Sequence, residues 1–324
     1  MLGATKSLLQ AIGSATDKGL AALRSATTWL NSPPLTAEGL RGKVVLVDFC
    51  TYTCINWLRT LPYRRAWANK YAAHGLVLIG VHTPEFVFES DLDNVRKALN
   101  VMRVDYPIAV DNAYAIWNAF DNQYWPALYF IDAQGTIRHR QFGEGAYDEA
   151  ERTIQRLLAK TGARGVPTDM VTVEGRGIEA APDWDNQRSP ENYLGSDRTA
   201  QFVSSGDPSK LRLNQWTVTG NWALRRDAAA LNAAGGRIVS RFHARDLHLV
   251  MGPAQRGGSV RFRVRIDGQP PATARGGDID EQGQGVVSDQ RLYQLVRQPQ
   301  PIKDRHFEIE FLDGGVDAFA FTFG

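Results

Sequence analysis

Two short stretches in the first half of the chain are apolar almost without interruption. Val44–Val47 and Leu76–Val81 are rich in β-branched residues, and runs of this length are typical of strands buried on both faces of a parallel sheet. Periodic segments suit helices at Asp91–Leu99, Tyr114–Phe120 and Glu149–Lys160, and a hairpin at Trp125–Ile131 with Thr136–Phe142. The pattern predicts an α/β domain over residues 35–163.

The rhythm changes in the second half of the chain. Val260–Ile266 and Phe307–Phe311 alternate strictly between apolar and polar residues, and glycine-containing turns such as Asp313–Gly315 follow them. Short alternating strands with turns at this spacing are typical of an antiparallel sandwich, which we expect over residues 191–324. Residues 164–190 lack periodicity and are rich in Gly, Pro and Asp, so they predict a linker.

The first 34 residues form a third region. Leucines and isoleucine recur at roughly helical spacing from Thr5 to Leu30, and Asn31–Pro34 ends the pattern. We expect an N-terminal helical segment packed on the body, with a membrane-surface anchor as the alternative. No apolar run reaches 18 residues, so we expect no membrane-spanning segment in this sequence.

Composition narrows the class of protein. Hydrophobic residues make up 43% of the chain and charged residues 22%, which is ordinary for a globular protein. The formal net charge is only +2, and no block of five or more basic residues occurs. We therefore expect no nucleic-acid partner.

Both cysteines of the chain flank one predicted turn. Cys50 ends the first apolar strand, and Cys54 follows Thr51-Tyr52-Thr53 at the start of a helix. The unpaired N–H groups and the positive dipole at a helix N-terminus favour a thiolate, so Cys54 is the candidate nucleophile. The alternative is a pair of buried, inert cysteines.

This stretch resembles the active site of the TlpA-like thioredoxin-fold domain in DipZ-type cytochrome c biogenesis proteins. The residues that match are Phe49, Thr51–Asn56 and Arg59–Tyr63. Two positions depart from the family pattern: Cys50 stands where the family has Trp, and Trp57 stands where it has the second cysteine of its CxxC motif. A CxxxC motif remains, and the resemblance implies an α/β thioredoxin-like domain.

The resemblance also implies roles for residues outside the motif. Asp48, six residues before Cys54, matches a buried carboxylate that moves protons to the resolving cysteine, and burial would raise its pKa. Pro126 matches the family's cis-proline. An ordinary core carboxylate and a trans turn proline are the alternatives. We therefore expect a catalytic group of Cys54, Cys50, Asp48 and Pro126. The substrate-binding group that we expect is Trp57, Trp125, Glu85 and Tyr52. His82 borders the cysteines, with a hydrogen-bonded strand-end histidine as the alternative.

The last residues, Ala318–Gly324, resemble the C-terminal domain of the same group, a jelly roll similar to carbohydrate-binding modules. Candidates for a sugar site are Trp216, Trp222, Arg291 and Tyr293. The alternative is that they are core and rim residues of a docking domain.

Three functions follow as hypotheses. The first is a periplasmic or otherwise extracytoplasmic thiol-disulfide oxidoreductase that uses no cofactor, acts on thiol or disulfide proteins or small molecules, and takes electrons from a membrane-embedded partner. In it Cys54 attacks and Cys50 resolves. The second is a Cu(I)-binding protein that uses both thiolates and His82. The third is a non-catalytic binding protein with a degenerate redox site.

Overall fold

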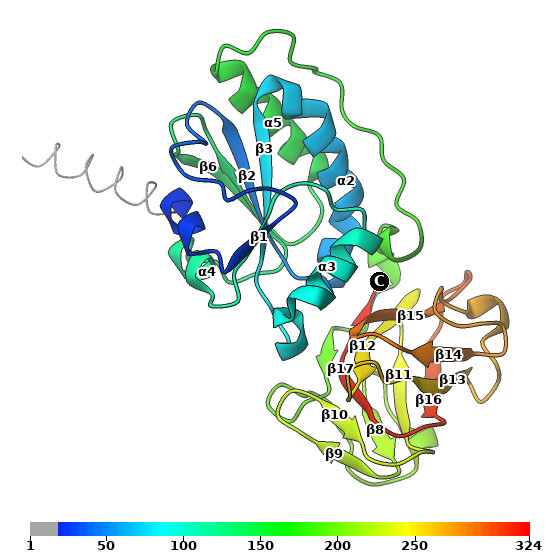
Figure 1. Ribbon diagram of the computed structural model, residues 1–324. Coiled ribbons are helices and arrows are strands. Elements are labelled where there is room, and N and C mark those ends of the chain that lie inside the picture. The colour runs from blue at the N-terminus through cyan, green and yellow to red at the C-terminus, as the bar shows by residue number, and fades with distance from the viewer. Residues whose placement is uncertain (1–18) are drawn as a thin grey trace, which may run out of the picture. The chain divides into compact units, whose positions relative to one another are not determined.

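A computed structural model of the protein describes residues 19–324. The helices expected between Thr5 and residue 18 lie outside the described residues. The chain forms two compact units, the first ending at Gly175 and the second beginning at Arg176 (Figure 1). Each unit is built around a sheet arrangement of its own.

The first unit contains one mixed sheet. Its strands are β1 (Thr28–Leu30), β2 (Val44–Cys50), β3 (Leu76–His82), β4 (Ile108–Val110), β5 (Ala127–Ile131) and β6 (Ile137–Phe142). Their order is β1-β4-β3-β2-β5-β6. The central strands β2, β3 and β4 are parallel, whereas β5 and β6 are antiparallel. All seven residues of β2 are buried, which confirms the buried parallel strand that its apolar run predicted.

Helices cover both faces of this sheet (Figure 1). They are α2 (Ile55–Tyr71), α3 (Leu92–Val101), α4 (Ala115–Ala119) and α5 (Tyr147–Lys160). Side chains at alternate positions of β2 point to opposite faces. Val45, Val47 and Phe49 share a core cluster with Ile116 and Trp117 of α4, while Asp48 contacts α2. Among the described residues, no helix is both long enough and apolar enough to cross a membrane.

The helical prediction is wrong for Thr28–Leu30. These residues form β1, which pairs antiparallel with β4 at the edge of the sheet. The unpaired edge of β4 offers backbone donors and acceptors to this segment, and Thr28 and Trp29 are residue types that favour strands. Before β1, Leu23 of the short 3-10 helix Ala22–Ser25 is fully buried in the core cluster that contains Phe49.

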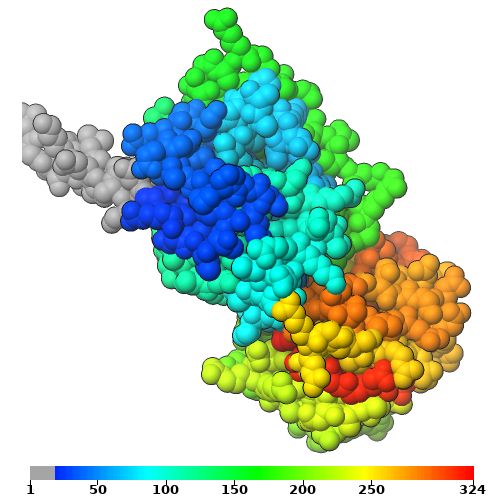
Figure 2. Space-filling view, viewed as in Figure 1, coloured from blue at the N-terminus to red at the C-terminus, as the bar shows by residue number. Residues whose placement is uncertain are grey.

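The chain after α5 runs over the surface of the first unit, where Figure 2 shows it in green. Lys70 on α2 forms an ion pair with Asp169 at 3.2 Å. The amide of Val171 donates to the carboxylate of Glu151 on α5 at 2.9 Å. Part of the irregular segment is therefore held by polar contacts, although it has no helix or strand before residue 176.

The second unit is an all-β sandwich of two sheets. Its strands are β7 (Asn192–Tyr193), β8 (Trp216–Thr219), β9 (Trp222–Leu224), β10 (Ala229–Leu231), β11 (Arg237–Phe242), β12 (Asp246–Pro253), β13 (Val260–Ile266), β14 (Gln284–Val287), β15 (Arg291–Arg297), β16 (Arg305–Phe311) and β17 (Val316–Phe323). One sheet has the order β15-β12-β17-β10-β9, with β7 added on β17, and the other has the order β14-β13-β16-β11-β8. All pairs of strands are antiparallel.

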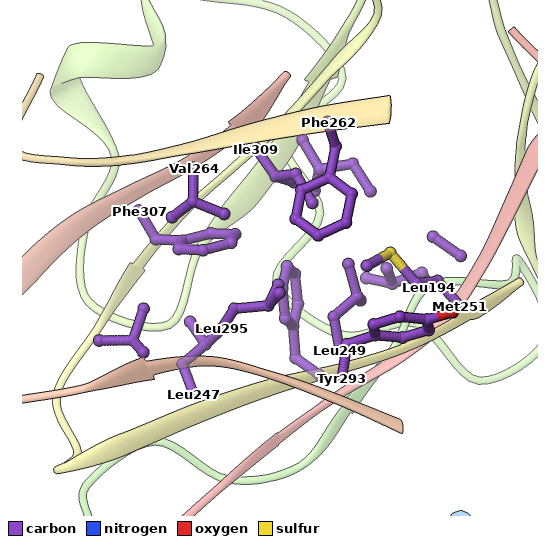
Figure 3. Packing of buried hydrophobic residues seen from close by; sticks show 14 of the residues in the cluster. Leu194, Leu247, Leu249, Met251, Phe262, Val264, Tyr293, Leu295, Phe307 and Ile309 are labelled. Carbon is purple, nitrogen blue, oxygen red and sulfur yellow. The ribbon is translucent and has the colours of Figure 1, made fainter. Parts of the chain in front are cut away.

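The core of the sandwich lies between these sheets. Figure 3 shows Leu249 and Tyr293 from one sheet facing Phe262 and Ile309 from the other. The alternation in Val260–Ile266 places Phe262 and Val264 in this core, while Arg263 and Arg265 form ion pairs with Glu310 and Glu308. The period-2 pattern therefore predicted the buried face correctly.

Candidate active site

Cys54 lies where the strand–turn–helix pattern predicted it. It is the N-cap residue of α2, and its carbonyl accepts a helical hydrogen bond from the amide of Leu58 at 3.0 Å. The side chain is half-buried, and both cysteines are free thiols. Its thiol donates to the carbonyl of Trp125 at 3.8 Å, beside the cis peptide bond between Trp125 and Pro126. The Cys54 sulfur therefore lies between a helix N-terminus and the cis-proline loop.

Cys50 is the last residue of β2 and is completely buried. Its thiol donates to the carbonyl of Val81 on the neighbouring strand at 3.5 Å. Burial raises the pKa of this thiol well above its ordinary value, and the carboxylate of Asp48 adds to the effect. Cys50 is therefore a protonated thiol in this structure, shielded from solvent.

Asp48 is fully buried and has a polar partner on each carboxylate oxygen. The indole N–H of Trp57 donates to one oxygen at 2.9 Å, and Nε of Arg64 donates to the other at 3.3 Å. Burial raises the pKa of Asp48, while Arg64 and Trp57 oppose the rise. The predicted burial of this carboxylate is confirmed, and each of its oxygens accepts one hydrogen bond from α2.

Trp57 and Tyr52 are buried, whereas a substrate-binding role would place their side chains at the surface. Trp57 is 0% exposed and Tyr52 is 2% exposed. The indole of Trp57 holds Asp48, and the ring of Tyr52 stacks on His82 with 5.8 Å between ring centroids. Both side chains point into the domain, where Trp57 has a polar partner and Tyr52 an aromatic one.

The other two predicted substrate-binding residues lie on loops that border Cys54. Trp125 is half-buried, and its indole N–H donates to the carbonyl of Thr83 at 3.1 Å. Glu85 is half-buried, and its backbone amide donates to Glu89 at 2.7 Å. The loop after β3 is thus joined to the cis-proline loop.

Glu89 is a residue that sequence reasoning missed. Its buried carboxylate accepts from the Thr53 amide at 3.2 Å, the Thr53 hydroxyl at 2.6 Å and the amides of Glu85 and Phe86 at 2.7 and 2.9 Å. It lies in the 3-10 helix Val87–Ser90. Burial raises its pKa against the effect of these hydrogen bonds. A glutamate in a loop gives no periodic signal, so only the folding of the loop reveals that it braces the turn before Cys54.

His82 lies beside Cys50. The two residues are paired across the parallel strands β2 and β3, and His82 is fully buried. Burial lowers its pKa to about 4, so the imidazole is neutral near neutral pH. In the described part of the chain neither ring nitrogen has a hydrogen-bond partner on another residue, which differs from the expected hydrogen-bonded strand-end histidine.

The copper hypothesis finds little support in this arrangement. Within residues 19–324 no group of three or more His, Cys, Asp or Glu side chains is placed to hold a metal ion. The two thiolates and His82 suggested by the sequence therefore do not form a three-ligand site in this conformation.

The sugar-site candidates lie mainly inside the sandwich. Trp216 and Tyr293 are fully buried members of its core, as the alternative of core and rim residues predicted. Trp222 packs partly buried on that core, 5.7 Å from the ring of Phe311. Arg291 forms an ion pair with Asp278 at 2.6 Å and lies 3.7 Å above the ring of Tyr293. Both readings were open from the sequence because aromatic residues suit a sugar site as well as a core.

The strand order of the first sheet and the position of the Cys54 thiol define the first unit as a thioredoxin-like domain. Comparison with protein families agrees. The AhpC/TSA family matches residues 30–140, and a family described as thioredoxin like C-terminal domain matches residues 189–324.

Individual relatives resemble one or both units. Protein DipZ of Mycobacterium bovis and of Mycobacterium tuberculosis is 34% identical over 331 residues, covering 98% of this chain and 44% of DipZ. Thiol-disulfide oxidoreductase YkuV of Bacillus subtilis is 31% identical over 140 residues, covering 43% of this chain and 93% of YkuV. The solution structure of an oxidised thioredoxin-like protein is 30% identical and covers 41% of this chain and 90% of that protein, with a TM-score of 0.39.

The chain belongs to the DipZ/TlpA-like family of thioredoxin-fold proteins, to which the thiol-disulfide oxidoreductases are related. It spans less than half the length of the DipZ proteins that it matches.

Proposed function

We propose that the protein is an extracytoplasmic thiol-disulfide oxidoreductase in which Cys54 is the nucleophile and Cys50 the resolving thiol. The observation that carries this proposal is the placement of Cys54, a half-buried free thiol at the N-cap of α2 beside the cis-proline loop. The N–H groups and dipole of the helix favour a thiolate there. Similarity to YkuV, a thiol-disulfide oxidoreductase by name, supports the same chemistry.

The reaction proceeds by two thiol–disulfide exchanges. The Cys54 thiolate attacks one sulfur of a substrate disulfide, forms a mixed disulfide with it, and releases the other sulfur as a thiolate that takes up a proton. The Cys50 thiolate then attacks the Cys54 sulfur and releases the second substrate thiol. The substrate gains two electrons, and the protein gains a Cys50–Cys54 disulfide. The reverse sequence oxidises a substrate dithiol.

Cys50 is the other cysteine of the chain, and three residues separate it from Cys54. The family's resolving position is filled by the buried Trp57. A disulfide requires Cα atoms within about 7 Å. The buried thiol of Cys50, with its raised pKa, must lose its proton and turn away from Val81 before it can attack. We therefore expect the second exchange to be slower than the first.

Location and partners are part of the same proposal. The resemblance of the active-site stretch to DipZ-type proteins, together with 34% identity to DipZ, is the ground for proposing an extracytoplasmic site of action. The proposed substrates are thiol or disulfide proteins or small molecules, and the proposed electron donor is a membrane-embedded reductant. A carbohydrate partner, and with it the likeness of the sandwich to carbohydrate-binding modules, has weaker support because Trp216 and Tyr293 are buried.

Mass spectrometry of the intact protein tests this function. After oxidised glutathione and alkylation, the wild type should contain no alkylated cysteine and weigh two hydrogens less than the reduced chain, as an internal disulfide requires. Cys50→Ser should accumulate one glutathione on Cys54, and Cys54→Ser should accumulate none. Two alkylated thiols in the treated wild type would contradict the redox function, and a stable glutathione adduct in the wild type would contradict the role of Cys50.

A further inference from the structure

We propose that His82 is the general base that accepts the proton of the Cys50 thiol when Cys50 attacks the mixed disulfide on Cys54. This inference rests on the proposed function, and it adds a catalytic residue that neither the motif nor the resemblance assigns. It concerns the second exchange alone, because His82 is paired with Cys50 and not with Cys54.

The first support is position. Cys50 and His82 are register partners on the parallel strands β2 and β3, and neighbouring strands lie about 4.8 Å apart. Paired residues project to the same face of a sheet. The His82 ring also stacks on Tyr52, two residues after Cys50, which keeps the ring near the turn that joins the two cysteines.

The second support is that the ring nitrogens of His82 make no hydrogen bond to another residue in the described part of the chain. His82 is 0% exposed. Buried polar groups are nearly always hydrogen-bonded, and exceptions call for an explanation. A neutral imidazole that carries one free lone pair beside a buried thiol is such an explanation, because the lone pair becomes occupied when the thiol ionises.

The third support is that the other ionisable groups around Cys50 are unsuited to the task. They come from several elements: Asp48 on β2, Arg64 on α2, Glu89 in the loop after β3, Tyr106 before β4, and Cys54 itself. Asp48 is held by Arg64 and Trp57, and Glu89 accepts four hydrogen bonds. Burial raises the pKa of Tyr106 well above its ordinary value, so its hydroxyl stays protonated.

The proton transfer leaves the net charge of the site unchanged. The imidazole takes the proton of Cys50, and the resulting thiolate attacks the Cys54 sulfur as the bond between Cys54 and the substrate sulfur breaks. The leaving thiolate then receives the proton from the imidazolium. Burial disfavours an isolated thiolate or imidazolium, but here the two charges arise side by side and attract each other in a site of low dielectric.

The experiment uses the full chain and 5,5′-dithiobis(2-nitrobenzoate), which releases one coloured thiolate when Cys54 is modified and a second when Cys50 resolves the adduct. We expect His82→Asn to leave the first release within about twofold of wild type and to slow the second about 100-fold near neutral pH, the usual size of a general-base effect. His74→Asn, which changes a histidine outside the site, is the matched control and should leave both releases unchanged.

The pH profile of the wild type gives a second readout that needs no variant at His82. With an internal base, the rate of the second release should be nearly constant between about pH 5 and about pH 8, because the proton moves inside the protein; without one it should rise about tenfold per pH unit as Cys50 ionises to solvent. A tenfold rise, or a second release that is equally fast in His82→Asn, overturns the role of His82. A wild type that makes only the first release, like Cys50→Ser, overturns the proposed function and the inference together.

Discussion

At the scale of single residues, Trp57 and Cys50 are the two positions that differ from the family motif, and both bear on the contacts of Asp48 and His82. An indole at position 57 donates to Asp48, which also pairs with the buried Arg64. This carboxylate is then part of a buried hydrogen-bonded group that joins β2 to α2. Each of its oxygens accepts one hydrogen bond from α2. The neutral His82 lies on the strand beside Cys50, where we propose that it accepts the proton of that thiol.

The same histidine makes stability depend on pH. Its pKa is about 4 in the folded protein against 6.5 for the free side chain. As the pH falls from about 6.5 to about 4, the unfolded chain binds a proton at His82 that the folded chain does not, so the folded state loses about 3 kcal/mol from this residue. Above about pH 6.5 both states are neutral at this position and the loss is absent.

We expect His82→Asn to remove this loss of folding stability at acidic pH. The measurement is hydrogen exchange of peptides from β2 and β3 at about pH 7 and about pH 4.5, corrected for the intrinsic pH dependence of exchange. Wild type should lose more protection than the variant on acidification. An equal loss in both proteins would show that His82 is protonated in the folded state. The comparison is between the losses of protection that each protein shows on acidification. A destabilisation by the substitution that is the same at both pH values therefore cancels.

At the scale of elements, three loops meet at Cys54 and are fixed by a few polar contacts. Glu89 joins the turn before Cys54 to the loop after β3. Trp125 joins that loop to the cis-proline loop through the carbonyl of Thr83. Cys54 is therefore a helix N-cap residue, and a buried carboxylate holds the turn that precedes it.

Removal of the Glu89 brace should loosen the turn. Glu89→Ala leaves three buried donors and the half-buried amide of Glu85 without their acceptor, and we expect a local destabilisation of about 3 kcal/mol. Glu89→Gln retains one carbonyl acceptor and should have an intermediate effect. Hydrogen exchange over residues 51–56 and the rate of Cys54 alkylation measure the change. Glu85→Gln, a substitution in the same loop, is the control, and equal effects of Glu85→Gln and Glu89→Gln would contradict the bracing role.

At the scale of the whole molecule, each unit has its own hydrophobic core. Phe49, Ile79 and Tyr129 belong to one cluster, and Phe262 and Ile309 belong to another. No residue is common to these two clusters. Domains with separate cores can open separately.

We expect core substitutions to act within one unit. Phe262→Ala removes a fully buried ring and should cost about 3–5 kcal/mol, seen as lost exchange protection in β12, β13 and β16 but not in β2 or β3. Phe49→Ala, also fully buried, is the matched substitution and should show the opposite distribution. Loss of protection in both units from either change would show that they unfold as one.

The sequence by itself determined the elements whose signals are local. The apolar runs predicted β2 and β3, and strict alternation predicted β13 and β16 with their buried faces. A cysteine after a strand and a short turn predicted the N-cap of α2. These features follow from a residue and its near neighbours, because the side-chain periodicities of strands and helices are properties of the local backbone.

Only the tertiary structure decided how side chains distant in sequence are partnered. It placed Thr28–Leu30 beside β4, turned Trp57 and Tyr52 inward, buried Glu89 under the turn, and left the His82 ring without a hydrogen-bond partner among residues 19–324. The physical reason is that burial and hydrogen bonding depend on which surfaces meet when the chain closes, and the energy of a polar group depends on the partners that it finds there. A pattern of residue types contains the local periodicity of strands and helices, but it does not contain the partners that a side chain meets in the folded chain.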